Sequence, residues 1–307
     1  MKICWFGNYD SSYARNKILI DGLRAHEVQI IECNANGQGL RAYAELLKKY
    51  RSIERDIDYI YCAFPIHFSI FIALFSKKPV IADVLVSLYD SSITDRRLYS
   101  RFHPIALLLR WLDMIIVKLA DIVIVDTEAH KQYFSQWCHK SKIAIVPVGV
   151  HTGEFFPISS KRKAQKHFIV QFHGSYIPLQ GIEKIVAAAL LLKNDHTIHF
   201  RLIGDGQEYS HIHKLVLELK LPNITFLPWL TIQDLNIAIN EADIVLGIFG
   251  DSAKVDRIIP NKLFQGLAAK KPVITKDTAT IRRYFSDKDI FLTQNYPENI
   301  TEALKTL

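Results

Sequence analysis

Three basic residues surround Pro260 in the C-terminal half of the chain. Lys254, Arg257 and Lys262 lie just before or at the start of the apolar segment in "AKVDRIIPNKLFQGLAA". The proline predicts the start of a helix, because its missing N–H costs nothing in a first turn. Helix N-termini normally attract acidic residues, so cations here oppose the helix dipole. The pattern predicts a site where amides and cations bind one phosphate or diphosphate; a solvated basic loop is the alternative.

Two carboxylates and one histidine follow other apolar runs. Asp83 ends "PVIAD", Asp90 lies a few residues later, and His67 follows "YIYCAF". A carboxylate at the end of a buried strand can accept a proton or bind a hydroxyl, and it can equally cap a helix. We therefore treat Asp83 and Asp90 as catalytic candidates and His67 as a candidate for ligand contact.

Glycine-containing loops follow several runs as well. Gly7 opens "GNYDSSYAR", where a helix is expected to begin near residue 12 or 13 with Arg15 in its first turn. In the second half, "HGSYIPLQG" leads into a helix whose first amides could bind an anion. Gly204 would let a flat ring approach the main chain, and Trp229 offers an apolar wall, although simple core burial is the alternative for tryptophan.

Apolar runs alternate with helical patterns along the whole chain. The first half contains "KICWF", "VQIIEC", "YIYCAF", "PVIAD", "DIVIVD" and "IAIVPV", and the second contains "HFIVQF", "IHFRLIG", "ITFLP", "DIVLGIF", "KPVIT" and "DIFLT". Consecutive apolar residues are typical of parallel strands that are buried on both faces. The sequence predicts two doubly wound α/β domains, 1–150 and 168–307, joined by the polar, basic linker 151–167.

Composition narrows the class of protein and of partner. The 307 residues are 49% hydrophobic, which is typical of a compact globular chain, and carry a formal net charge of +7. An anionic partner is expected, but no zinc-finger or arginine–glycine pattern supports nucleic-acid binding. Four widely spaced cysteines predict buried thiols in a reducing, cytoplasmic compartment, and the N-terminus is too short in apolar residues for a signal peptide.

The longest apolar stretch, residues 104–120, is interrupted by Arg110, Asp113 and Lys118. These charges and its length exclude a membrane span. The stretch predicts a helix packed on a sheet, with a helix lying on a membrane surface as the alternative.

These segments together resemble a retaining glycosyltransferase of the GT-B type, family 4 (glycosyl transferases group 1). The resemblance covers nearly the whole chain and rests on "GNYDSSYARNKILIDGL", "SLYDSSITDRR", "DTEAH", "VPVGV", "FHGSYIPLQGIE" and, most specifically, "LGIFGDSAKVDRIIPNKLFQGLAAKKPVIT". It implies two Rossmann-like domains facing across a cleft. It also implies a nucleotide-diphosphate sugar bound mainly by the C-terminal domain, an acceptor held by the N-terminal domain, and no cofactor or bound metal.

The resemblance, together with the loop positions, assigns roles to individual residues. Donor binding falls to Ser175, Gln180, Gly204, Trp229, Lys254, Arg257, Asn261, Lys262 and Gln265. The acceptor side comprises Gly7, Asn8, Tyr9, Arg15 and His67, with Arg15 alternatively a phosphate ligand. Asp83, Asp90 and Lys262 are the expected catalytic residues.

The sequence departs from the family pattern at functionally important positions. The usual pair of glutamates corresponds to Arg257 and Gln265, and the usual arginine and lysine of the phosphate loop correspond to Ser175 and Gln180. The usual histidine on the acceptor rim corresponds to Leu85. We expect the cations near Pro260 to replace the missing phosphate ligands, because fixed positive charges stabilise a departing nucleoside diphosphate.

The leading hypothesis is transfer of a sugar, with retention of configuration, to a glycan or lipid-linked acceptor, with possible peripheral contact to a membrane. A sugar-nucleotide epimerase and a non-catalytic GT-B partner subunit are the alternatives. Family members commonly continue into a further terminal helix, so the end at Leu307 suggests a short natural form or a truncated chain.

Overall fold

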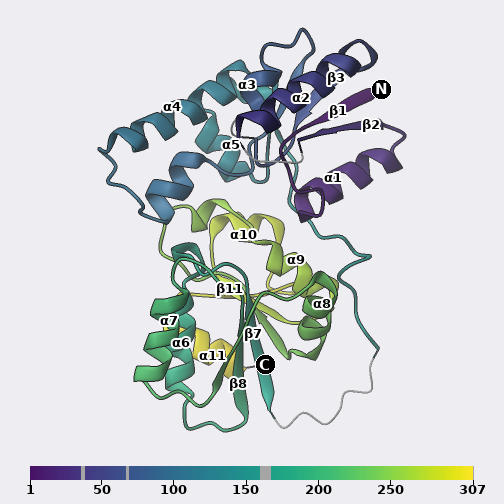
Figure 1. Ribbon diagram of the computed structural model, residues 1–307. Helices are drawn as coiled ribbons and strands as arrows, with labels where there is room; N and C mark the ends of the chain where they lie inside the picture. Colours follow the sequence, from purple (N-terminus) through teal and green to yellow (C-terminus); the bar gives the residue numbers. More distant parts are fainter. Residues whose placement is uncertain (36–38, 67–68, 160–166, 307) are drawn as a thin grey trace. The chain divides into compact units, whose positions relative to one another are not determined.

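The computed structural model describes residues 1–35, 39–66, 69–159 and 167–306. They form two compact units (Figure 1): Met1–Ile93 with Leu98–Gly149, and Thr94–Arg97 with Val150–Leu307. No helix in the described ranges combines the length and apolar character needed to cross a bilayer.

The first unit is a six-stranded parallel sheet with helices between successive strands. Its strands are β1 (Lys2–Gly7), β2 (Gln29–Asn34), β3 (Tyr59–Cys62), β4 (Val80–Asp83), β5 (Ile122–Val125) and β6 (Ile143–Ile145), in the spatial order β2-β1-β3-β4-β5-β6. Its helices are α1 (Ala14–Ala25), α2 (Leu40–Ile53), α3 (Ser69–Ala73), α4 (Pro104–Leu119) and α5 (Glu128–Phe134), with short helical turns η1 (Glu54–Asp56), η2 (Asp90–Asp95) and η3 (Lys140–Lys142).

The second unit repeats the plan. Its strands are β7 (Phe168–His173), β8 (Ile198–Ile203), β9 (Ile224–Leu227), β10 (Ile244–Leu246), β11 (Val273–Lys276) and β12 (Phe291–Thr293), in the order β12-β11-β10-β7-β8-β9. The helices are α6 (Ile182–Leu191), α7 (Tyr209–Glu218), α8 (Ile232–Glu241), α9 (Asn261–Ala268), α10 (Ala279–Tyr284) and α11 (Pro297–Lys305), and the turns are η4 (Pro178–Gln180) and η5 (Val255–Arg257).

Burial on both faces of the central strands explains their unbroken apolar sequences. Trp5 and Phe6 are neighbours in β1 and both are fully buried, yet they belong to different core clusters, because successive side chains of a strand point to opposite faces. Trp5 also stacks on Tyr61 of β3 with ring centroids 3.9 Å apart. In β10, Val245 likewise packs in a different cluster from Leu246. The predicted pair of parallel, doubly wound sheets is confirmed.

Chain order reverses once in each sheet. In the first unit β1 has β2 on one side and β3 on the other, and in the second unit β7 has β8 on one side and β10 on the other. Crevices for ligands in open α/β sheets form at such reversals, outside the carboxyl ends of the strands. The loops after β7 and β10, and those after β1 and β3, are therefore the places to look for a site.

Candidate functional site

The loops after β7 and β10 are joined through their main chains. The Phe249 amide donates to the Gln180 carbonyl at 2.9 Å, and the Gly250 amide donates to the Leu179 carbonyl at 3.2 Å. A Cβ on Gly181 would lie 2.4 Å from the Phe249 carbonyl carbon, so only glycine permits this approach; its φ of +64° favours glycine too. These contacts hold the two loops at the sheet reversal as one backbone unit.

A second close glycine contact joins the loop after β8 to the loop after β7. A Cβ on Gly204 would lie 2.2 Å from the Gly174 carbonyl oxygen, and the φ of Gly204 is +123°. The Gly174 amide donates to the Ile203 carbonyl at 3.0 Å, and the Tyr176 amide donates to the Asp205 carbonyl at 2.9 Å. Gly204 thus supports the loop that begins at Gly174, and contact with a flat ring of the ligand stays a prediction.

Lys262 of α9 reaches the same loop from the other side of β7. It is only 5% exposed, its Nζ donates to Gln180 Oε1 at 2.5 Å, and the ammonium lies 3.8 Å from the centroid of the Phe172 ring. A Cβ on Gly174 would lie 3.2 Å from Nζ. Burial lowers the pKa of Lys262 well below its usual value. Its polar contact within the described residues is a neutral amide oxygen, so an anion at this position would be stabilised strongly.

A chain of hydrogen bonds orients Gln265 on the same helix. Arg201 Nε donates to Gln171 Oε1 at 3.0 Å, Gln171 Nε2 lies 3.4 Å from His173 Nδ1, and His173 Nε2 lies 2.9 Å from Gln265 Oε1. Arginine can only donate, so each amide and the imidazole must accept on one side and donate on the other. Burial, and secondly the charge of Lys262, lowers the pKa of His173 to about 3, which keeps it neutral as this chain requires. Gln265 is left with its NH₂ group as the donor it can offer a ligand.

The remaining donor-side residues are less closely grouped. Asn261 is the first residue of α9, and Pro260 precedes the helix as its N-cap residue in extended conformation, where the sequence suggested the first helical position. Lys254 directly precedes η5 and is 7% exposed. Arg257 is the last residue of η5 and is half-buried. Ser175 is half-buried in the loop after β7.

The structure does not bring Trp229 to this group. Trp229 follows β9, which is the edge strand two positions from β7, and its side chain is 57% exposed. Adjacent strands are about 4.8 Å apart, so its loop begins about 10 Å from the loop after β7. Its exposure rules out the alternative of core burial, and its role as an apolar wall for a ligand stays a prediction.

In the first unit, two predicted site residues pair with each other. Arg15 Nε and Nη2 donate to the two carboxylate oxygens of Asp83 at 3.0 and 2.9 Å, and both side chains are fully buried. Arg15 Nη1 also donates to the Val146 carbonyl at 2.7 Å. Burial raises the pKa of Asp83, while Arg15 opposes that effect. The sequence predicted a catalytic role for Asp83 and an acceptor-side or phosphate-binding role for Arg15; in the structure they form a buried bidentate ion pair that links α1 to β4, and Arg15 also links α1 to the segment after β6.

Asp90 lies in the turn that follows β4 and is 1% exposed. Its backbone amide donates to Ser87 Oγ at 2.9 Å. Asp113 of α4 holds this turn: it accepts from Ser87 Oγ at 2.6 Å and from the amides of Leu88 and Tyr89, each at 3.0 Å. Burial raises the pKa of Asp113 to about 6 against the lowering effect of those bonds. Asp113 therefore positions the segment that carries Asp90.

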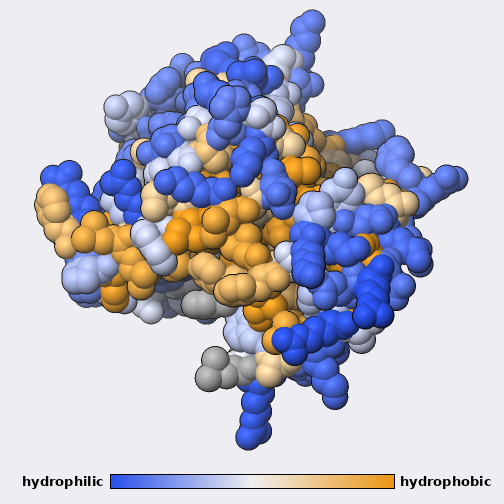
Figure 2. Space-filling model, turned by 90° about the horizontal axis from the view of Figure 1, so that it is seen from above, coloured by the Kyte–Doolittle hydropathy of each residue, from blue (hydrophilic) through white to orange (hydrophobic). Residues whose placement is uncertain are grey.

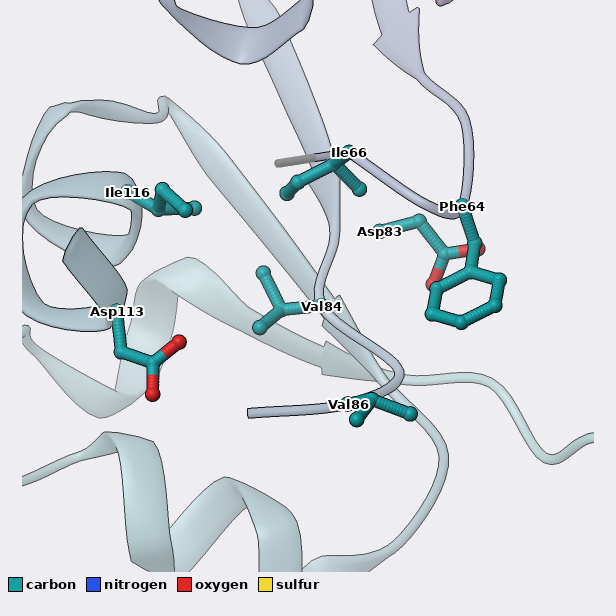
Figure 3. Close-up of a pocket in the computed structure, with 7 residues that line it drawn as sticks. All are labelled: Phe64, Ile66, Asp83, Val84, Val86, Asp113 and Ile116. Carbon is teal, nitrogen blue, oxygen red and sulfur yellow. The ribbon is translucent and has the colours of Figure 1, made fainter. Parts of the chain in front are cut away.

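A small cavity lies between Asp83 and Asp113 (Figure 3). Asp83 and Asp113 both line it, with Val84 between them in this view, together with Phe64, Ile66, Val86 and Ile116. Its volume is about 10 Å³, which is room for roughly one water molecule and too little for a sugar.

The loop after β1 is fixed to its neighbours. Tyr9 is 6% exposed; its amide donates to Asn34 Oδ1 at 3.2 Å and its hydroxyl donates to Glu32 Oε2 at 3.1 Å. Gly7 ends β1 with φ +151°, and Asn8 between them is half-buried. The Tyr9 side chain is therefore directed to β2. His67 lies outside the described residues.

Sequence reasoning missed Gln171 and His173. Both are polar residues inside the otherwise apolar run "FIVQFH", and they point to the same face because they are two residues apart. Polar side chains in a doubly buried strand need partners, so this interruption was the available signal.

Comparison with known proteins agrees with the fold. Residues 167–307 match the family model described as Glycosyl transferases group 1. The structure superimposes on Anabaena HepE in complex with UDP and glucose with a TM-score of 0.69, at 15% sequence identity, and the match covers 100% of this chain and 89% of that one. It superimposes on the sucrose-phosphate synthase of Thermosynechococcus elongatus with a TM-score of 0.76, at 14% identity, over 100% of this chain and 89% of that one. The TM-score for WaaG, a glycosyltransferase involved in lipopolysaccharide biosynthesis, is 0.65 at 13% identity, and the match covers 99% of this chain and 89% of that one.

The chain has the GT-B fold. The probable glycosyltransferase WbjE of Pseudomonas aeruginosa is 28% identical over 183 residues, which are 57% of this chain. The match spans 42% of that relative's length. The family match thus falls on the GT-B unit that contains Lys262 and the loop after β7.

Proposed function

We propose that the protein is a glycosyltransferase that takes a sugar from a nucleoside diphosphate and passes it to a glycan or lipid-linked acceptor. The observation that carries this proposal is the buried Lys262 side chain at the reversal of the second sheet. It lies beside the loop 174–180, in which Ser175 and Gln180 stand where basic residues would otherwise be expected. Lys262 thus supplies from α9 the positive charge that the loop itself lacks.

The chemistry follows from charge. When the bond between the sugar and the nucleoside diphosphate breaks, negative charge grows on the departing phosphate oxygen. A fixed ammonium and the first amides of α9 stabilise that charge with little reorganisation. The low exposure of Lys262 strengthens this effect, because electrostatic interactions grow as water is excluded.

Retention of configuration and independence from bound metal are further parts of the proposal. They are tested by incubating the protein with a panel of nucleotide sugars, with and without EDTA, and following release of nucleoside diphosphate. NMR of the product reports the anomeric configuration. Unchanged turnover in EDTA and a retained anomer are expected; an inverted anomer would overturn retention alone.

A non-catalytic binding subunit is the competing function, and one observation favours it. Arg257 and Gln265 occupy the positions where the resemblance expects two acids. Calorimetry with nucleoside diphosphates, followed by turnover assays with acceptors, separates the outcomes. Binding of a nucleoside diphosphate followed by transfer supports the transferase, and failure to bind any nucleoside diphosphate favours the non-catalytic subunit.

Cytoplasmic location and peripheral contact with a membrane also belong to the proposal. A membrane-bound fraction that is released by high salt or carbonate would support them.

A further inference from the structure

Helix α4 has apolar side chains on both of its faces. Ala106, Ile116 and Val117 are buried in the first unit. On the opposite face Leu107, Leu108, Trp111 and Leu119 are 59%, 51%, 50% and 57% exposed. Their spacing places them along one outward stripe of the helix. A surface helix normally has a polar outer face, so this stripe marks a surface that contacts something apolar.

The stripe continues into the segment before the helix. Leu98, Tyr99 and Phe102 are 51%, 40% and 75% exposed, and the guanidinium of Arg101 lies 4.8 Å from the centroid of the Phe102 ring. Figure 2 shows apolar side chains gathered on the side of the molecule where α4 lies in Figure 1. We call the exposed residues between Leu98 and Leu119 the α4 surface.

The charges on the α4 surface all have one sign. Its exposed ionic side chains are Arg101, Arg110 and Lys118, and the one acid in this sequence range, Asp113, is 1% exposed and turned inward to Ser87. Lys142 adds a further base at the end of the helix, where its Nζ donates to the carbonyls of Lys118 and Ala120 at 3.1 and 2.8 Å. A surface that joins leucines and aromatic rings to cations alone complements an anionic lipid headgroup layer above hydrocarbon.

We propose that the α4 surface docks the protein on a bilayer that contains anionic lipids. Trp111, Tyr99 and Phe102 enter the boundary between headgroups and acyl chains, where amphipathic rings are favoured. Arg101, Arg110 and Lys118 pair with lipid phosphates. The helix lies in the plane of the interface and does not span it, consistent with its 16 residues. This proposal does not depend on the proposed transferase activity.

Vesicle binding tests it with the full chain. Co-sedimentation with vesicles of phosphatidylcholine alone and with added phosphatidylglycerol is compared at low and physiological salt. We expect binding to the anionic vesicles, and about a fivefold loss for each of Arg110→Gln and Lys118→Gln. The double variant Leu108→Ser/Trp111→Ser is expected to lose binding to the anionic vesicles.

Leu217→Ser is the matched control, because Leu217 is 64% exposed but lies on α7 of the second unit. Circular dichroism confirms that each variant is folded. Absence of wild-type binding to anionic vesicles, or equal binding by the double variant and the control, would overturn the proposal. A change from dimer to monomer in the double variant, without lipid binding by the wild type, would assign the surface to a second copy of the chain instead.

Discussion

Replacement of Lys262 by methionine separates its proposed ligand role from a structural one. Burying an ammonium costs several kcal/mol. In the ligand-free protein this cost is offset by a charge-assisted bond to Gln180, worth about 1.5–3 kcal/mol, and by the Phe172 ring, worth about 2 kcal/mol when desolvated. Methionine keeps the apolar stem on Phe172 but leaves Gln180 Oε1 without its donor, at about 1–3 kcal/mol. The opposing terms cancel to within about 2 kcal/mol.

Affinity for a nucleoside diphosphate should change far more. Loss of a buried cation that faces a phosphate costs about 3 kcal/mol, or about a hundredfold in the dissociation constant. Calorimetry with UDP and with uridine supplies the contrast, since uridine lacks the diphosphate and its affinity should not change. Lys270→Met, at an exposed lysine just after α9, is the matched control.

Two outcomes would refute this reasoning. One is wild-type affinity of Lys262→Met for UDP, which would remove Lys262 from the binding site. The other is a fall in melting temperature of more than about 8 °C with UDP affinity retained, since about 2 kcal/mol corresponds to at most that shift for a unit of this size. That result would make Lys262 a structural residue.

Three further predictions concern other residues. Because the native pKa of Asp113 is about 6 and its ordinary value 3.8, the folded protein binds a proton that the unfolded chain has released; stability should fall by about 2 kcal/mol between pH 4 and 6, and Asp113→Asn should abolish that slope in urea unfolding. Gly204→Ala should lower the free energy of unfolding by more than about 2 kcal/mol, whereas Gly22→Ala, at an open position of α1, should raise it by about 0.5–1 kcal/mol. Equal melting temperatures of the two variants would contradict the close approach at Gly204. His173→Phe removes the hydrogen bond that orients Gln265, so its side-chain amide can rotate. Calorimetry should show about tenfold weaker binding of a nucleoside diphosphate, which corresponds to the loss of one hydrogen bond. An unchanged affinity would argue against the positioning role of His173.

Local sequence was sufficient to predict the sheets. Runs such as "DIVIVD" and "DIVLGIF" are apolar on consecutive residues because both faces of β5 and β10 are covered, and this requirement is visible without coordinates. The position of a basic helix start at α9 was equally visible, since it depends on Pro260 and its neighbours.

Side-chain partners were not predictable in the same way. Arg15 and Asp83 are 68 residues apart, and Lys262 and Gln180 are 82 apart, so their pairing depends on strand order and on the directions of side chains. An isolated Asp83 at a strand end gives no sign of whether it faces a ligand or an arginine. The location of Trp229 has a related cause: its distance from the loop after β7 follows from the place of β9 at the sheet edge.

The glycine contacts around Gly174 and Gly181 have a consequence for redesign. Gly181 lies against the peptide groups of Phe249 and Gly250, and Gly204 lies against that of Gly174; peptide groups have no rotamers, so these loops beside Lys262 are pre-organised before a ligand binds. Attempts to change the ligand that this unit binds should therefore leave these loops intact and exchange side chains that project from their rims. A library randomised at the glycines would mostly yield misfolded protein, while one randomised at Ser175 and Asn261 would sample new selectivity on a rigid base.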